Sequence, residues 1–320
     1  MRCPTLKELP PPPPGKTGWP WTEESPQLPD TMPDGRTWPK VTIVTPSYNQ
    51  GQFIEETIRS VLLQGYPNLE YIIIDGGSTD GSVEVIRKYE KWLTYWVSEP
   101  DRGQSDAINK GFAMAKGEIL AWLNSDDLYT PGAVAEVGRA YADNPGFIVA
   151  GAVVEFDSRT GREIRTVMPR GMSFENMVEI WKRRFRWHQP GVFFPRSAYE
   201  QVGGMDISLE YAMDFDIICR LLRICQVTYI EKVLARFRHH PSSKTDSQFL
   251  QQILEVRMVL RRFWHLLPDG RPGKLKWLAA WDLFRFAASQ LLRYRRPKNA
   301  FGLLIEGIKF IIPLRKWNTS

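Results

Sequence analysis

Two adjacent carboxylates, Asp126 and Asp127, stand two residues beyond the apolar run Ile119–Leu123. Like charges side by side repel and lose hydration on burial, so such a pair usually has a cation beside it. Their hard oxygens suit Mg²⁺ or Mn²⁺. A turn whose Asn and Asp side chains cap backbone groups explains the segment Asn124–Asp127 equally well. The pair alone leaves both a metal site and a turn open.

Short β-rich runs alternate with amphipathic segments ahead of this pair. We expect strands at Val41–Thr45, Tyr71–Ile74, Tyr95–Val97 and Ile119–Leu123, and helices near residues 53–62, 83–89 and 105–115. The alternation predicts an α/β protein with a mostly parallel central sheet and helices on both faces. In such sheets ligands bind beyond the carboxyl ends of the strands.

Each expected strand is followed by a polar segment, at residues 46–51, 75–82, 99–104 and 124–127. Any one of them could be a turn, but four at one edge favour a binding crevice. The chain lacks the glycine-rich dinucleotide fingerprint and the P-loop, which argues against dehydrogenases and P-loop enzymes. A nucleotide could instead stack on Tyr48 and donate a base N–H to Asp75, with a cation on Asp126 neutralising its diphosphate.

In this order the segments resemble those of the family 2 glycosyltransferases, inverting enzymes of the GT-A fold that use nucleotide-diphosphate sugars. The resemblance covers about residues 40–243 and rests on Val44–Asn49, Ile74–Ser82, Gly103–Gly111 and Leu123–Asp127. The donor nucleotide contacts that it implies are Pro46, Ser47, Tyr48, Asn49, Asp75, Gly76, Ser78, Gln104, Asp106, Lys110, Asn124 and Ser125.

The D-x-D motif of that family falls on Asn124–Asp126, with Asn124 in place of the first acid. The resemblance makes Asp126 the expected ligand of Mn²⁺ or Mg²⁺ and Asn124 a neutral contact to the sugar or ribose. Asp127 is then a supporting carboxylate or a helix cap. His240, or its neighbour His239, could complete the metal shell from a loop that folds back over the diphosphate; a basic surface turn is the alternative.

The general base of the family sits on a helix after a Gly-Gly turn, and Gly203-Gly204 here precedes such a segment. The resemblance places the base at Asp214, where Met213 replaces the acid that often comes before it. Asp216 is expected to be solvated or paired with an arginine. Trp187, His188 and Gln189 resemble the acceptor-side loop, although a lone histidine is more often structural.

Three regions differ in composition. Residues 1–39 are rich in proline, which predicts an extended or poorly ordered segment, either a solvated tail or a strap over the domain. Residues 40–244 hold the expected catalytic domain. Residues 245–320 have helical periodicity, and residues 275–294 and 301–312 mix aromatic with basic side chains, as an interfacial helix would. Packing on the catalytic domain explains the same mixture.

A net charge of +6 is compatible with anionic substrates, membrane surfaces or nucleic acid. No nucleic-acid module accompanies it, so we expect no nucleic-acid partner. Three cysteines without metal or redox spacing fit a reducing cytosol, and no apolar run is long enough to span a bilayer. We therefore expect a cytoplasmic protein, with membrane contact at the inner face of the cell membrane through its C-terminal helices left open.

The expected function is inverting transfer of a sugar from a nucleotide-diphosphate sugar to a hydroxyl of a saccharide or glycolipid, in cell-surface polysaccharide or glycolipid synthesis. The alternative is a catalytically silent relative that binds a nucleotide sugar or glycan and acts as a partner protein. Asn124 and Met213, which replace acids of the family, are the reason for keeping that alternative.

Overall fold

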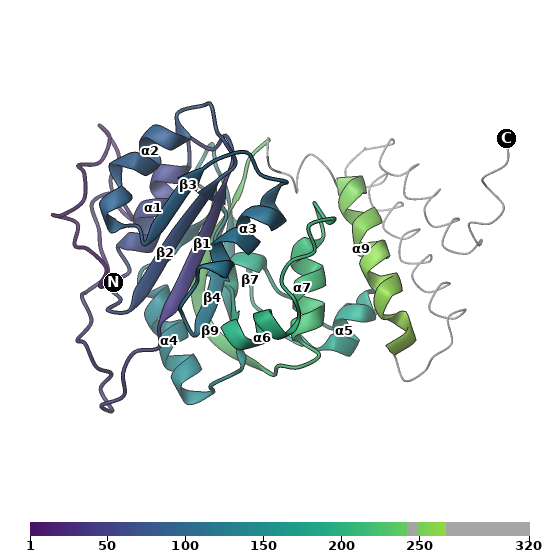
Figure 1. Cartoon of the computed structure of the whole chain (residues 1–320). Coiled ribbons are helices and arrows are strands. Elements are labelled where there is room, and N and C mark those ends of the chain that lie inside the picture. The colour runs from purple at the N-terminus through teal and green to yellow at the C-terminus, as the bar shows by residue number, and fades with distance from the viewer. Residues whose placement is uncertain (242, 244–248, 267–320) are drawn as a thin grey trace.

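The computed structural model describes residues 1–241, 243 and 249–266. It is a mixed α/β structure built around a nine-stranded sheet (Figure 1). The strands are β1 Val41–Ser47, β2 Leu69–Asp75, β3 Tyr95–Ser98, β4 Ile119–Trp122, β5 Leu128–Tyr129, β6 Ile148–Asp157, β7 Glu163–Val167, β8 Val192–Pro195 and β9 Val227–His239. The α-helices are α1 Ile54–Leu62, α2 Ser82–Lys88, α3 Gln104–Ala113, α4 Ala133–Asp143, α5 Phe174–Val178, α6 Arg196–Gln201, α7 Met213–Leu221 and α9 Phe249–Phe263. Short 3₁₀ turns are η1 Glu90–Trp92, η2 Ile180–Lys182, η3 Gln189–Gly191 and η4 Trp264–Leu266.

The first half of the sheet is parallel, in the order β3-β2-β1-β4. Every residue of β1, β2 and β4 is buried because helices cover both faces. Alternate side chains of each strand enter two separate cores: Ile43 packs with α1 and α4, whereas Val44 packs with α3 and α7. The predicted strands and the fold class are confirmed, and the four polar segments meet at one edge.

The second half of the sheet brings later residues to the same edge. Strand β8 pairs antiparallel with both β4 and β6, and β9 runs parallel to β6. The two-residue strand β5 pairs antiparallel with β9. Because β5 begins immediately after Asp127, this pairing fixes the acidic pair against the end of β9.

A glycine sets the distance between α3 and the sheet. A Cβ on Gly111 would lie 2.5 Å from a Val44 methyl carbon, so only glycine lets the helix lie this close to β1. The N-terminus of α3, with Gln104, is thereby held near the ends of β1 and β4.

The N-terminal segment lies along the α1 and α2 side of the domain as a strap (Figure 1). Arg59 of α1 is fully buried under it and donates to the backbone oxygens of Pro10, Pro20 and Trp21 at 2.8 to 3.0 Å. The guanidinium also lies 5.4 Å from the ring centroid of Trp21. One buried cation therefore holds three points of the strap.

At the other end of the chain, α9 packs on α7. The helices expected over residues 275–294 and 301–312 lie outside the described residues. Within the described part of the chain, no helix is both long and apolar enough to cross a membrane.

Candidate active site

A cleft of about 1180 Å³ opens at the carboxyl ends of the parallel strands. Its lining comes from the segments after β1, β2, β3 and β4, from the β6–β7 hairpin, from residues 186–189 and from the start of α7. The predicted residues among its lining are Pro46, Ser47, Tyr48, Gly76, Gln104, Asn124, Ser125, Asp126, Trp187, His188, Gln189 and Asp214. Strand ends far apart in the sequence thus form one cavity, as the motif spacing predicted.

The loops after β1 and β2 are locked to each other behind this lining. Asn49 has a positive φ of 52°, its N–H donates to Ser78 Oγ at 2.7 Å, and its Oδ1 accepts from Thr79 N–H at 2.9 Å. These bonds hold the first loop so that the ring of Tyr48, 64% exposed, stands in the cleft.

Asp75 organises the second loop. Its fully buried carboxylate accepts from the N–H groups of Gly77 and Ser78 and from the hydroxyls of Ser78 and Ser98, at 2.6 to 3.2 Å. A direct contact between Asp75 and a nucleotide base stays a prediction.

Gly76 lies against the loop after β3. A Cβ at Gly76 would meet Asp101 Oδ2 at 2.8 Å, which is closer than any real side chain tolerates. A side chain at position 76 would therefore require the Asp101 carboxylate to move.

A chain of amides crosses the floor of the cleft. Gln104 Nε2 donates to Asn124 Oδ1 at 2.7 Å, Asn124 Nδ2 lies 3.5 Å from Gln189 Oε1, and Gln189 Nε2 donates to the backbone oxygen of Trp122 at 2.8 Å. An aspartate at position 124 could still accept from Gln104 but could not donate onward. Asn124 therefore suits this neutral network, which joins predicted donor-side residues to the acceptor-side Gln189.

Asp106 and Lys110 lie outside the described lining and pair with neighbours. Arg102 donates to Asp106 at 2.9 Å and lowers the pKa of that carboxyl. Lys110 lies 3.0 Å from Glu99 and 3.7 Å from Asp106. Their predicted contact to a donor is not tested by this geometry.

The acidic pair lies beside the end of β9. Asp126 Oδ2 lies 2.9 Å from His240 Nε2, whereas His239 faces the other way, with Nε2 3.1 Å from Glu155 Oε2. Of the two histidines left open by the sequence, the geometry brings His240 to Asp126.

Arg238 fixes the backbone around both acids. Its Nε donates to the Asp126 backbone oxygen at 2.7 Å, and its own N–H donates to Asp127 Oδ1 at 3.0 Å. The guanidinium also pairs with Glu56 at 2.8 Å and lies 4.7 Å from the ring of Phe53. This buried arginine could not be recognised from sequence, because these partners come from two distant segments, residues 53–56 and 126–127.

The residues present fit a divalent cation. Asp126 and His240 supply an oxygen and a nitrogen ligand side by side, and two protein ligands leave positions for diphosphate oxygens and water. Asp127 is fully buried, its Oδ2 has no hydrogen-bond partner among the described residues, and burial beside Asp126 raises its pKa. A nearby cation would offset that cost. No cluster of three His, Cys, Asp or Glu side chains with metal-binding geometry occurs within the described residues.

Asp214 is the second residue of α7 and lines the cleft. Burial raises the pKa of its carboxyl to about 6, even though its Oδ1 accepts from Phe215 N–H at 2.7 Å. A carboxylate with a pKa near neutrality is suited to accept a proton at physiological pH.

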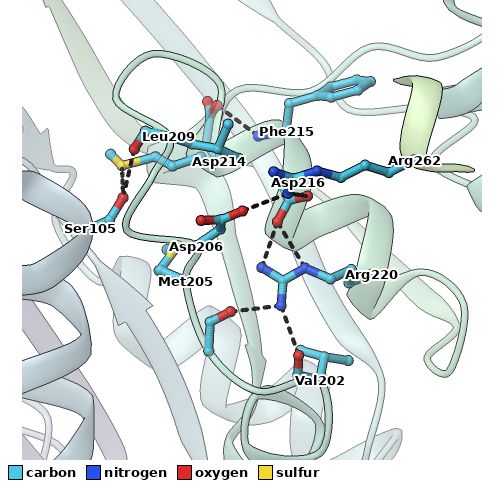
Figure 2. A network of polar contacts seen from close by, with 12 residues as sticks. Ser105, Val202, Met205, Asp206, Leu209, Asp214, Phe215, Asp216, Arg220 and Arg262 are labelled. Carbon is cyan, nitrogen blue, oxygen red and sulfur yellow. Dashed lines mark hydrogen bonds and ion pairs between the residues drawn. The ribbon is translucent and has the colours of Figure 1, made fainter. Parts of the chain in front are cut away.

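Asp216 projects to a different side of the same helix (Figure 2). It is buried and binds Arg220 through Nε at 2.8 Å and through an ion pair at 2.6 Å. Arg220 in turn donates to the backbone oxygens of Val202 and Gly204. Asp216 is arginine-paired, as expected, and joins α7 to the Gly-Gly turn.

The acceptor-side wall contains a group that sequence reasoning missed. Glu155 is an acid in the mostly apolar strand β6, accepts from Arg165 at 2.7 Å and lies 3.6 Å from His188 Nε2. Burial alone would raise the pKa of Glu155, but hydrogen bonds from His239 and Arg165 outweigh it and lower the pKa to about 2. An acid interrupting a buried strand was the signal available in the sequence.

His188 is a mostly buried, neutral histidine packed against Phe237. Burial lowers its pKa to about 4, and its ring centroid lies 4.3 Å from that of Phe237. Other cleft residues absent from the sequence expectations are Glu210, Tyr211, Phe237, Arg186 and Gln252.

Comparison with known proteins adds a family match and similar sequences. Residues 42–203 match the model described as "Glycosyl transferase family 2". An uncharacterized glycosyltransferase of Mycobacterium tuberculosis is 32% identical over 207 residues, which is 62% of this chain and 75% of the relative. Glycosyltransferase TuaG of Bacillus subtilis, named for teichuronic acid biosynthesis, is 41% identical over 92 residues, 28% of this chain and 36% of the relative.

Two solved structures resemble the fold. TarS 1–349 of S. aureus, in complex with UDP-GlcNAc, superposes with a TM-score of 0.62 at 14% identity, over 85% of this chain and 82% of that one. Against a longer TarS chain the match spans 49% of that protein. The mannosyltransferase PcManGT of Pyrobaculum calidifontis, in complex with GDP-Man and Mn²⁺, gives 0.54 at 20% identity, over 91% of each chain. Likeness at this identity shows the fold alone, which is the predicted GT-A type.

Proposed function

Because the chain belongs to glycosyl transferase family 2, we propose that it is a metal-dependent, inverting glycosyltransferase. Its donor is a nucleotide-diphosphate sugar and its acceptor is a hydroxyl of a saccharide or glycolipid. The observation that carries this proposal is that Tyr48, Asp126 and Asp214 line one cleft, and that His240 lies 2.9 Å from Asp126.

Asp214 is the proposed general base. In a single in-line displacement the acceptor oxygen attacks the anomeric carbon while the Asp214 carboxylate takes the hydroxyl proton. The bond from the anomeric carbon to the diphosphate oxygen breaks, and its electron pair leaves with the nucleotide diphosphate. Attack from the face opposite the leaving group inverts the anomeric configuration, and the base contributes ~10²–10⁴-fold to such a step.

Asp126 and His240 would hold the divalent cation, Mn²⁺ or Mg²⁺. When bound there, the ion supplies Lewis-acid stabilisation of the negative charge on the departing diphosphate. The chain's own part at this end is to hold the Asp126 backbone through Arg238 and to keep His240 against the ring of Phe53, centroids 4.8 Å apart.

The donor nucleotide is proposed to stack on Tyr48 and to contact the two loops that contain Asn49 and Asp75–Ser78. Gln104 and Asn124, which are hydrogen-bonded to each other in the cleft, are proposed to contact the ribose or sugar. The PcManGT complex with GDP-Man and Mn²⁺ supports this assignment of a nucleotide-sugar donor with a metal.

The acceptor is proposed to be a saccharide chain at the aromatic wall formed by Trp187, Tyr211 and Phe237, which line the cleft beside Asp214. Aromatic faces provide apolar contact area with polar edges for such a ligand. The partial match to TuaG supports a setting in cell-surface polysaccharide synthesis.

A donor panel tests the proposal. Thermal shift with UDP-, GDP-, dTDP- and CMP-sugars in the presence of Mn²⁺ should identify one stabilising donor, and that donor should release nucleotide diphosphate on incubation. NMR of the transfer product, made with a short saccharide acceptor, should show the anomeric configuration opposite to that of the donor. Retention of configuration would reject the inverting mechanism.

A catalytically silent relative is the second candidate, favoured by Asn124 and Met213 at positions where relatives have acids. Such a protein would bind the donor with Mn²⁺ but release no nucleotide diphosphate from it. The release assay therefore separates the two functions.

Contact with a membrane surface is a further part of the proposal and concerns the basic and aromatic residues 275–294 and 301–312, which lie outside the described residues. The proposed location is the cytoplasm, at the inner face of the membrane. Flotation of the full chain with anionic vesicles, compared with neutral vesicles, tests it; equal absence from both floated fractions would reject membrane contact.

A further inference from the structure

The backbone that leads into α7 is capped by a side chain from another helix. Glu255 of α9 accepts from the N–H groups of Glu210, Tyr211 and Ala212, at 3.0, 2.6 and 2.9 Å. Ala212 is the N-cap residue of α7 and has no side chain that could cap the helix. The free N–H groups at a helix start need such a partner, and a carboxylate there also complements the helix dipole. Glu255 supplies both functions from 43 to 45 residues away.

A second polar contact lies seven residues, about two helical turns, further along α9. Arg262 binds Asp206 on the Gly-Gly-Met-Asp turn at 2.5 Å and lies 3.6 Å from Asp216 of α7, as Figure 2 shows. Residues seven apart share one helix face. One face of α9 therefore binds the segment 206–216 at both ends through Arg262 and in the middle through Glu255.

Apolar side chains between and just after Glu255 and Arg262 pack α9 on the domain. Val259, Leu260 and Phe263 are buried, and the Phe263 ring meets that of Phe174 edge-on, with centroids 5.6 Å apart. These apolar contacts fix the position of α9, from which Glu255 and Arg262 make their polar contacts.

Asp214 follows directly on the capped residues. Only Met213 separates it from Ala212, whose N–H is bound to Glu255. The side chain of Asp214 lines the cleft, where a base must lie within hydrogen-bond reach of the acceptor hydroxyl. A displacement of the first turn of α7 would move this carboxylate directly, and about 1 Å of misplacement can cost about 10²-fold in rate.

We propose that Glu255 is a positioning residue for the transfer reaction: by capping α7 from α9 it holds the Asp214 carboxylate at the place where the acceptor proton is taken. The inference rests on the proposed function for the role of Asp214. It assigns a task in the active site to a helix that follows the region matched by the family model, which ends at residue 203.

The experiment compares the full-length Glu255→Gln and Glu255→Asp variants with the wild type. Glu136→Gln is the matched control, because it removes the same charge from an exposed pair with Arg139 on α4. Amide hydrogen exchange, which needs no donor, should rise about fivefold at residues 210–212 in Glu255→Gln, the factor for loss of a cap of ~1 kcal/mol. It should stay unchanged in β1 and β4 and in the control.

Turnover of the donor found in the panel gives the second measurement. In Glu255→Gln we expect kcat to fall about tenfold or more. The dissociation constant of the donor should change less than about twofold, because Glu255 binds residues 210–212 and not the loops after β1 and β2 that are proposed to hold the nucleotide. Glu255→Asp keeps the charge on a shorter side chain, and its kcat should lie between those of the wild type and Glu255→Gln.

Unchanged exchange at residues 210–212 in Glu255→Gln would overturn the capping role. Faster exchange with wild-type kcat would overturn the positioning role. If Glu255→Gln fails to fold, the same two criteria are applied to Glu255→Asp. A wild-type protein that turns over no donor would reject the transferase function itself, whereas a loss confined to the Glu255 variants supports this inference.

Discussion

Asp126 and Asp214 are carboxylates of one cleft with different surroundings. Asp126 has His240 2.9 Å away and Arg238 on its backbone, an arrangement suited to a cation. Asp214 is held in a buried position where its carboxyl resists ionisation, an arrangement suited to proton transfer. The proposed division between metal ligand and base thus rests on environment rather than on residue type.

Asp214→Asn tests the base. The amide has the same shape but cannot accept the acceptor proton, so kcat should fall by ~10²–10⁴-fold. Donor affinity, measured by calorimetry with Mn²⁺, should not change. The exposed Asp143→Asn serves as a control, and wild-type turnover in Asp214→Asn would remove Asp214 from the base role.

The pH dependence follows from the same carboxyl. Burial raises its pKa to about 6, so the basic form is present above that pH and is lost as the pH falls through it. The ratio kcat/KM should therefore decline below pH 6 with an apparent pKa near that of Asp214. A profile that stays flat down to pH 5 would contradict this assignment.

At the scale of elements, helices and loops are joined by contacts between distant segments. The strap is the clearest case, because its only regular pairing is the isolated bridge between Thr31 and Thr37, yet it closes over Arg59 of α1. The strap is held by the Arg59 side chain and by backbone hydrogen bonds to the domain, such as Cys3 N–H to the Tyr66 oxygen and Ser25 N–H to the Leu63 oxygen.

Arg59→Met tests this anchor. The variant keeps much of the apolar stem but leaves three buried backbone oxygens without a donor, and each such group costs ~1–3 kcal/mol. We expect the free energy of unfolding, measured by urea denaturation, to fall by about 3 kcal/mol or more. Arg87→Met, at an exposed position of α2, should be close to neutral, and an equally stable Arg59→Met protein would show that the strap is not anchored there.

At the scale of the whole molecule, the cleft joins both halves of the sheet. Its walls come from the parallel half, from the β6–β7 hairpin and from α7, so a ligand that binds there contacts segments spread over most of the domain. Ligand binding should therefore stabilise the native state as a unit.

Nucleotide diphosphate with Mn²⁺ should raise Tm. At a free ligand concentration 100 times Kd the expected gain is ~2.7 kcal/mol. Asp126→Ala should lose the part that depends on Mn²⁺, while nucleotide alone still has Tyr48 to stack on. Equal Mn²⁺-dependent shifts in wild type and Asp126→Ala would reject Asp126 as a ligand.

Local sequence predicted the parallel half of the fold well. Val41–Ser47, Leu69–Asp75 and Ile119–Trp122 are mostly apolar runs, which is typical of buried parallel strands. The polar residues after them meet at one edge because parallel strands end together. The sequence also indicated Asp126, Asp214 and the Gly203-Gly204 turn as candidate site features, because each belongs to a short motif that is local in the chain.

Tertiary structure decided what depends on distant partners. Whether His239 or His240 meets Asp126 depends on where β9 ends: His239, its last residue, pairs with β6 and contacts Glu155, whereas His240, just after the strand, contacts Asp126. The lowered pKa of Glu155 and the cap from Glu255 arise from segments whose separation in sequence carries no periodic signal. The sequence determined which chemical groups stand at the strand ends, and only the packed fold decided which of them face one another, because side-chain contacts depend on the register and the close approach of elements far apart in the chain.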